Sequence, residues 1–192
     1  MRVTREKAAE NRSRVIAVAG KLFREHGFNG IGVADIMKAA DLTHGGFYGQ
    51  FDSKEDLAIE ASKAAHDKSQ LVWSDIAAKA PERSLAALVD HYLSKRHRDA
   101  PATGCAFAAL AIDAGRQGGT VQETFTEGLA PLVDILAKAF SKGSKAERHR
   151  KALATMAQLV GAVVLSRAVN DPALSDEILA SARKEILASA QA

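Results

Sequence analysis

Apolar residues recur at intervals of three and four along almost the whole chain, and this spacing constrains the fold more than any other feature. Val15, Leu22 and Phe23 share one face of a helix expected over residues 14–26. Further helices are expected over 33–40, 43–49, 53–75, 83–98, 105–116, 120–141, 146–169 and from 172 onward. Only four Pro interrupt a sequence rich in Ala, Leu, Lys and Glu. The pattern therefore predicts an all-α fold of about nine helices.

Short-range signals divide the first third of the chain into a compact unit. Gly27 suits the position after a helix end, where Phe28 can fold back as a hydrophobic contact. Thr43 is a suitable N-cap for the short helix over 43–49, and Ser53 with Asp56 forms an acidic variant of the capping box. The helices over 33–40 and 43–49 are separated by only a few residues, which predicts a helix-turn-helix.

Composition narrows the class of protein. Hydrophobic residues make up 47% and charged residues 26%, which is typical of a globular chain, and the 5% aromatic content predicts a mostly aliphatic core. Cys105 is the single cysteine, so no internal disulfide can form. No apolar run reaches the roughly 18 residues of a membrane span, and the N-terminus lacks an apolar signal segment. We expect a cytoplasmic protein with no cofactor and no metal site.

The net charge of +3 is unevenly distributed. Seven basic residues stand against two acidic ones in residues 1–24, a local charge of +5. The basic residues are Arg2, Arg5, Lys7, Arg12, Arg14, Lys21 and Arg24. Two interpretations remain open, a surface for a polyanionic partner and the solvated face of an amphipathic helix.

The stretch GFNGIGVADIMKAADLTHGGFYGQFDSKEDL, residues 27–57, carries a more specific pattern. Its agreeing positions include Gly27-Phe28, Gly32-Val33, Ile36, Ala40, Leu42-Thr43, Gly46, Phe47-Tyr48, Phe51 and Ser53-Lys54-Glu55. In order and spacing it resembles the DNA-binding domain of the TetR/AcrR family of bacterial transcriptional regulators. The resemblance implies a DNA-binding domain over 1–52 that continues into the helix over 53–75, and an effector-binding and dimerisation domain over 58–192.

The helix over 43–49 is too short to be stable alone, so Leu42, Phe47 and Phe51 are expected to hold it by packing. Its outer face then carries the candidate DNA contacts. These are Thr43, His44, Gly45 and Tyr48, and the resemblance adds phosphate contacts from Tyr48 and Lys54. Gly45 and Gly46 allow either close approach to DNA or a tight fit against the preceding helix. Gly32 stands where many relatives have Ser or Thr, which removes a cap and a possible phosphate contact.

The resemblance places a sensor pocket for a small-molecule effector among the fourth to seventh helices. The residues expected to give it polar specificity within an aliphatic wall are Trp73, His91, Tyr92, Cys105, Phe107, Asp113, Arg116 and Phe125. Cys105 is either a buried small hydrophobe or a redox or electrophile sensor. His91 and His97 are expected on different helix faces, so they do not indicate a metal site.

The resemblance implies that the last two long helices pair with those of a second subunit as a four-helix bundle, and their apolar stripes agree with this. The expected dimer residues are Leu153, Met156, Val160, Val163, Val164, Leu174, Ile178, Leu179 and Ile186, with an intramolecular core as the alternative. The function expected is repression through a palindromic operator bound as a homodimer, released by the effector. The alternatives are an activator and a helical protein-binding adaptor. An enzyme is not expected, because Cys105, His91 and Asp113 follow no nucleophile spacing.

Overall fold

A computed structural model of the chain describes residues 5–191, and this part is helical with no strand. The expected all-α fold is confirmed. The helices and 3-10 turns (η) are α1 (Arg5–His26), α2 (Val33–Ala39), η1 (His44–Gly46), α3 (Lys54–Lys79), η2 (Pro81–Arg83), α4 (Ser84–Tyr92), α5 (Lys95–Asp99), η3 (Pro101–Thr103), α6 (Ala106–Gln117), α7 (Gly119–Ala139), α8 (Lys145–Ala168) and α9 (Pro172–Gln191). No helix within residues 5–191 combines the length and apolar character needed to cross a bilayer.

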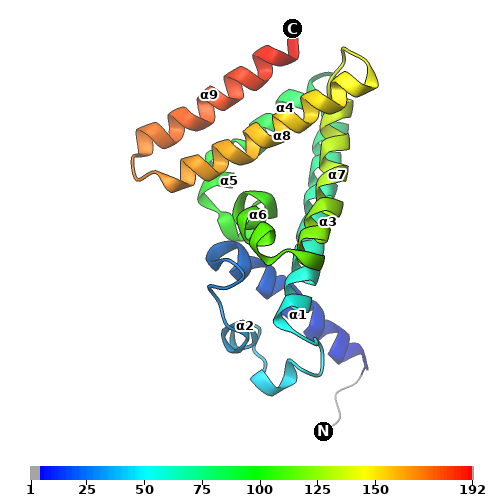
Figure 1. The fold of residues 1–192 in the computed structure, drawn as a ribbon, viewed down its shortest axis with the longest axis vertical. Coiled ribbons are helices and arrows are strands. Elements are labelled where there is room, and N and C mark those ends of the chain that lie inside the picture. Colours follow the sequence, from blue (N-terminus) through cyan, green and yellow to red (C-terminus); the bar gives the residue numbers. More distant parts are fainter. Residues whose placement is uncertain (1–4, 192) are drawn as a thin grey trace.

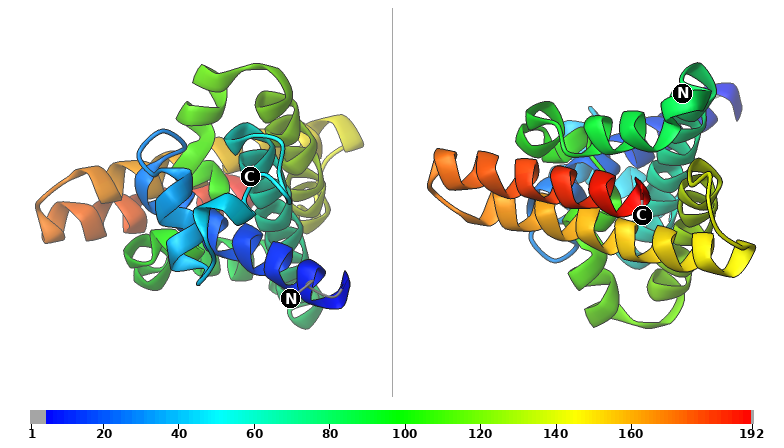
Figure 2. Two further views of the ribbon diagram at one scale, coloured as in Figure 1. Left: turned by 90° about the horizontal axis from the view of Figure 1, so that it is seen from below. Right: turned by 90° about the horizontal axis from the view of Figure 1, so that it is seen from above.

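The helices are arranged in two groups joined by α3. Figure 1 shows α1, α2 and η1 gathered at one end of the molecule, while α8 and α9 cross the opposite end. α3 leaves the first group and packs along α7. Seen from above in Figure 2, α8 and α9 lie side by side. α1 also packs against η3 and α6, so the N-terminal group contacts the rest of the molecule directly as well as through α3.

The local signals at the ends of α1 and α3 act as the sequence predicts. Gly27 has a φ of +75°, and Phe28 is buried against the end of α1. Ser53 Oγ accepts the Asp56 N–H at 3.0 Å, so Ser53 caps α3. The capping box is only half formed, because the Asp56 carboxylate accepts the N–H of Asp52, at 3.4 Å, and not that of Ser53.

Three expected helices differ in the structure. α1 begins at Arg5 and is longer than the apolar stripe, because polar and Ala-rich residues extend it. The helix expected over 43–49 is a 3-10 turn followed by a further turn, since two adjacent glycines disfavour an α-helix there. In the helix expected over 120–141, Pro131 is expected to cause a kink or break, but α7 continues through it as one helix.

The helix expected over 83–98 is two helices, α4 and α5. α4 ends at Tyr92 with Leu93 as its C-cap, and Ser94 caps α5, because its side chain accepts the His97 N–H at 3.2 Å. The His97 ring turns back to the carbonyl oxygen of Tyr92 at 2.6 Å. This break changes which residues α4 and α5 bring together.

Candidate nucleic-acid interface and effector cavity

The helix-turn-helix is held from inside by aromatic and aliphatic packing. Phe47 and Phe51 are buried with stacked rings whose centroids lie 5.5 Å apart. Ile36 and Met37 of α2 are fully buried beneath them in the same core. Packing therefore fixes the position of η1, as expected for an element too short to be stable alone.

The four candidate DNA contacts of this element share one exposed surface. Thr43, His44, Gly45 and Tyr48 are all exposed, and Tyr48 retains 68% of its accessible surface. The rings of His44 and Tyr48 pack edge to face with centroids 6.1 Å apart. Lys54 is half-buried at the first position of α3. The exposed Tyr48 ring also packs edge to face against the buried Phe47 ring, with centroids 5.2 Å apart, so the core holds this exposed ring pair in place.

Two details of this surface differ from the sequence expectation or resolve it. Thr43 occupies the N-cap position of η1 but makes no capping hydrogen bond, so its hydroxyl stays available. A Cβ added at Gly45 would meet no atom within 4 Å, whereas one at Gly46 would lie 3.7 Å from Met37 Cε. A tight fit against α2 therefore does not explain the glycine at position 45. Gly32 caps α2 without a side-chain hydrogen bond, as expected.

Two of the N-terminal basic residues serve the fold. Arg12 forms a bidentate ion pair with Glu60 of α3, and its guanidinium carbon lies 4.8 Å from the centroid of the Phe51 ring. Arg24 turns inward and donates to the carbonyl oxygen of Ala102. The basic surface is correspondingly smaller than the charge of residues 1–24 indicates.

The other basic residues of this stretch face outward where they are described. Arg5, Lys7, Arg14 and Lys21 are exposed on α1. Arg2 lies outside the described residues. These side chains supply the sequence-independent charge that the N-terminal unit offers to a polyanion.

One cavity of about 340 Å³ lies between α1, α3, α4, α5 and η3. Its lining consists of Arg24, Ala65, Lys68, Ser69, Val72, Trp73, His91, Tyr92, Ser94, Arg96, His97, Ala100, Thr103, Gly104 and Cys105. Half of the expected sensor residues are here, namely Trp73, His91, Tyr92 and Cys105. The volume lies near the lower end of the roughly 300–1,000 Å³ typical of small-molecule sites.

The other four expected sensor residues lie elsewhere. Phe107 and Phe125 pack against the buried ring of His66, with centroids 4.7 and 4.9 Å from it, so they belong to the core. Asp113 lies beside Gly27, where an added Cβ would come within 2.8 Å of the carboxylate. Arg116 is exposed on the last turn of α6. None of the residues that line the cavity belongs to α6 or α7.

Sequence reasoning missed the cationic part of the lining. Arg24 belongs to the basic stretch over residues 1–24, which was interpreted as a surface for a polyanion or as a solvated helix face, yet it reaches the cavity from α1. His91 and His97 were expected on different faces of one helix, but the break at Ser94 brings both into the lining. The N-cap preference of Ser94 was the one sequence signal that could have predicted this break.

His97 organises the cavity wall. Its Nε2 accepts the Cys105 N–H at 3.0 Å, so its Nδ1 carries the proton that bonds the Tyr92 carbonyl oxygen. Burial lowers the pKa of His97 and keeps the ring neutral. Burial also raises the pKa of the Cys105 thiol, which favours the small-hydrophobe interpretation of this cysteine. No cluster of metal-ligating side chains occurs within residues 5–191.

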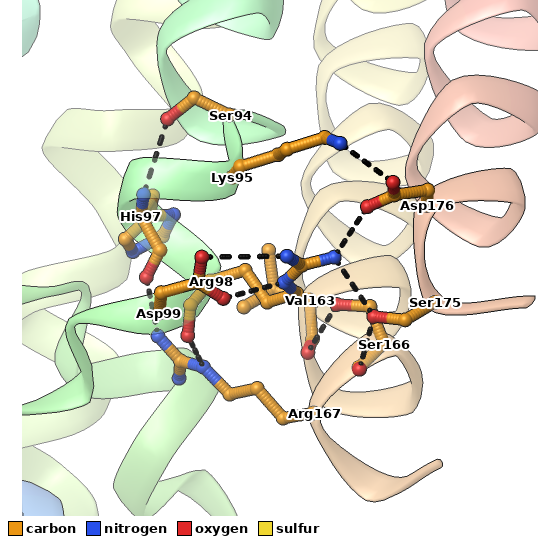
Figure 3. Close-up of polar contacts among 10 residues, drawn as sticks. All are labelled: Ser94, Lys95, His97, Arg98, Asp99, Val163, Ser166, Arg167, Ser175 and Asp176. Carbon is orange, nitrogen blue, oxygen red and sulfur yellow. Dashed lines mark hydrogen bonds and ion pairs between the residues drawn. The ribbon is translucent and has the colours of Figure 1, made fainter. Parts of the chain in front are cut away.

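The short helix α5 connects the cavity to α8 and α9 (Figure 3). Asp176 of α9 accepts from Lys95 at 2.6 Å and from Arg98 at 2.7 Å, and these two cations lower the pKa of its carboxyl. Arg167 of α8 donates to the backbone carbonyl oxygens of Arg98 and His97 at 2.9 and 2.8 Å. Because His97 also lines the cavity, α5 joins the cavity wall to α8 and α9 through these hydrogen bonds.

The residues expected at a dimer interface divide into two sets. Met156, Val163, Leu179 and Ile186 are buried inside this chain, as the intramolecular alternative predicts. Leu153, Val160, Val164, Leu174 and Ile178 are exposed or half-buried. Leu165, which the sequence analysis did not select, is 58% exposed on α8. Only the exposed or half-buried residues of the expected set are therefore accessible to a second subunit.

Residues 15–61 match the tetR family of bacterial regulatory proteins. The HTH-type transcriptional regulator AcrR of Shigella flexneri is 31% identical over 87 residues, which cover 45% of this chain and 40% of AcrR. An uncharacterised HTH-type transcriptional regulator of Mycobacterium tuberculosis is 25% identical over 191 residues, covering 92% of this chain and 94% of that protein. A TetR transcriptional regulator of Legionella pneumophila has the same fold, with a TM-score of 0.79, 19% identity and 97% of each chain covered. One from Chloroflexus aurantiacus gives a TM-score of 0.78 at 24% identity, covering 95% of this chain and 96% of that one.

Proposed function

The chain belongs to the tetR family of bacterial regulatory proteins and is a DNA-binding transcriptional regulator, and we propose that it represses transcription as a homodimer on a palindromic operator. A small-molecule effector in the cavity releases it from the DNA. The observation that carries this proposal is the exposed surface of Thr43, His44, Gly45 and Tyr48 on a packed helix-turn-helix. Binding to chromosomal DNA would place the protein in the bacterial cytoplasm.

Contact with the major groove assigns a role to each residue of that surface. Thr43 and His44 would reach base edges or the adjacent backbone, because they stand at the N-terminal end of the element. Tyr48 and Lys54 would contact phosphates on either side. The open space at Gly45 supports close approach by the DNA backbone, since nothing within the chain occupies it.

A homodimer through α8 and α9 is supported by an uncharged strip on α8. This strip consists of Leu153, Ala157, Val160, Gly161, Val164, Leu165 and Ala168, all exposed or half-buried. A Cβ at Gly161 would meet nothing within 4 Å, so this glycine leaves room for a neighbouring helix. Two-fold pairing of reading units then matches two half-sites about one helical turn apart.

Release would pass through α3 and α1. α3 carries Lys54 at one end and the cavity residues Lys68, Val72 and Trp73 further along. A ligand that favours one tilt of α3 alters the separation of the two reading units. A coupling of about 1–3 kcal/mol, a typical size, weakens DNA binding several-fold to about a hundredfold.

The test is titration of DNA from upstream of the protein's own gene, at two salt concentrations, followed by fluorescence anisotropy. We expect saturable, salt-sensitive binding that Tyr48→Ala and Lys54→Ala weaken and that Lys63→Ala, an exposed lysine elsewhere on α3, leaves unchanged. Equal affinity of all four proteins would contradict the assigned surface. Absence of specific binding on every promoter tested would instead favour a protein-binding adaptor.

A further inference from the structure

The cavity has a one-sided charge. Arg24, Lys68 and Arg96 line it, and none of the described lining residues is Asp or Glu. Lys68 and Arg96 are exposed and form no ion pair within residues 5–191. Cations gathered around a partly enclosed space attract an anion, because the low-dielectric walls focus their field.

Of the three cations, Arg24 is the only one whose side chain is half-buried, since Lys68 and Arg96 are exposed. Its Nε and Nη2 donate to the Ala102 carbonyl oxygen at 2.8 and 2.5 Å. A guanidinium has five N–H donors, so donors remain after these two bonds. No carboxylate of the described chain forms an ion pair with it, and burial accordingly lowers its pKa. The Arg24 charge is therefore satisfied in part by a backbone carbonyl oxygen and by no carboxylate hydrogen bond in the described chain, which leaves it able to bind an anion.

The cavity also has an apolar wall that includes two aromatic residues. Trp73 and Tyr92 are buried and pack edge to face with centroids 5.7 Å apart. Tyr92 Oη lies against the Cys105 thiol, and burial raises the pKa of the Tyr92 hydroxyl so that it keeps its proton. Val72 and Ala65 complete an apolar side. A ligand that fits here presents an apolar part to this wall.

From this combination we propose that the effector is a small aromatic carboxylate or similar organic anion whose charged end is bound by Arg24. Lys68 and Arg96 attract it at the mouth, and the ring part packs against Trp73 and Tyr92. The cavity of about 340 Å³ accommodates a ligand with one or two rings.

The position of Arg24 gives this site a direct connection to the DNA-reading unit. Arg24 lies in the last turn of α1, the first helix of that unit, and Ala102 lies in η3 of the other helical group. An anion on Arg24 shares or replaces the bond to Ala102, so occupancy alters the contact between the two groups. This regulatory consequence rests on the proposed function, whereas the anion preference itself does not.

The experiment measures binding of three matched probes to the full-length protein by isothermal titration calorimetry. The probes are 1-naphthoate, the neutral 1-naphthamide and the cationic 1-naphthylmethylammonium. We expect naphthoate to bind about tenfold or more tightly than naphthamide, as a charge-assisted hydrogen bond provides. Arg24→Gln should abolish this ratio and Lys68→Gln with Arg96→Gln should reduce it, while Lys63→Gln keeps it. Because the readout is a ratio between two probes, partial loss of folded protein affects both equally.

Equal binding of naphthoate and naphthamide, a preference for the ammonium, or no saturable binding of any probe at millimolar concentration overturns the inference. An unchanged ratio in Arg24→Gln overturns the assignment of Arg24. The anisotropy titration with operator DNA separates the two proposals. Operator binding without anion preference removes only this inference, and anion preference without operator binding removes only the proposed function.

Discussion

Lowering the pH from about 7 to about 5 is expected to destabilise the protein through His66 of α3. The His66 side chain is 5% exposed, and its ring lies between Phe107 and Phe125. Its Nε2 has no hydrogen-bond partner. Burial, with a smaller opposing effect from Asp67, lowers the pKa of His66 from 6.5 to about 4.

The magnitude follows from the two pKa values. Above a pH of 6.5 the imidazole is neutral in both the folded and the unfolded chain, so its full contribution is present. As the pH falls, the unfolded chain takes up the proton first, and the folded chain resists until about pH 4. Between about pH 7 and 5 the free energy of unfolding should therefore fall by about 2 kcal/mol. That is a large share of a typical stability of about 5–15 kcal/mol.

The assay is urea unfolding followed by circular dichroism at the two pH values. His66→Leu fills the site with an apolar side chain, so its loss of stability on acidification should be smaller than that of the wild type by about 2 kcal/mol. Exposed His149→Gln is the control and should lose as much as the wild type. The comparison uses the change with pH, so a cavity or clash in His66→Leu does not affect it. An equal pH dependence in His66→Leu and wild type would refute the reasoning.

Three further changes test other parts of the structure. Gly128→Ala should lower the free energy of unfolding by about 1–3 kcal/mol, because its Cβ would come within 2.4 Å of the confined His66 ring, and urea unfolding equal to the wild type would contradict this. Gly45→Ala should weaken operator binding several-fold without loss of stability, whereas Gly115→Ala, also in open space, should leave DNA affinity unchanged. Fluorescence anisotropy measures the affinity and thermal melting the stability; equal DNA affinity of the two variants would contradict the prediction. Leu153→Glu with Leu165→Glu should convert a dimer to a monomer in sedimentation equilibrium, while Ile112→Glu, equally exposed on α6, should not; an unchanged mass in the double variant would remove this dimer face.

Features that depend on neighbours in the chain could be predicted from the sequence. The Gly27 turn, the Ser53 cap and the inward side of Phe47 and Phe51 are set by local backbone preference and helical spacing, and the structure has all of them. The length of α1 and the 3-10 form of η1 were not predicted, since apolar spacing locates the buried part of a helix and not its ends.

Features that depend on tertiary contacts were beyond the same reasoning. Residues 1–24 carry a local charge of +5, but a charge count does not show in which direction each side chain points. Arg12 turns to Glu60 and Arg24 to Ala102, partners far along the chain. The cavity likewise depends on the break between α4 and α5, which His97 stabilises by binding the Tyr92 carbonyl and the Cys105 N–H together.

The position of the Arg24 side chain also bears on how DNA binding and effector binding are divided between the two expected domains. A boundary near residues 52–58 assigns DNA reading to one side and ligand binding to the other. Yet Arg24 of α1 lines the cavity proposed for the effector, and Lys54, an expected phosphate contact, is the first residue of the helix that carries Trp73. Under the proposed function, each unit would contribute a residue to the other's site. If the ligand and the operator each favour a different position of α1 and α3, binding of one weakens binding of the other. No longer chain of contacts between the two sites is required, because coupling needs only a shared element whose position both affect.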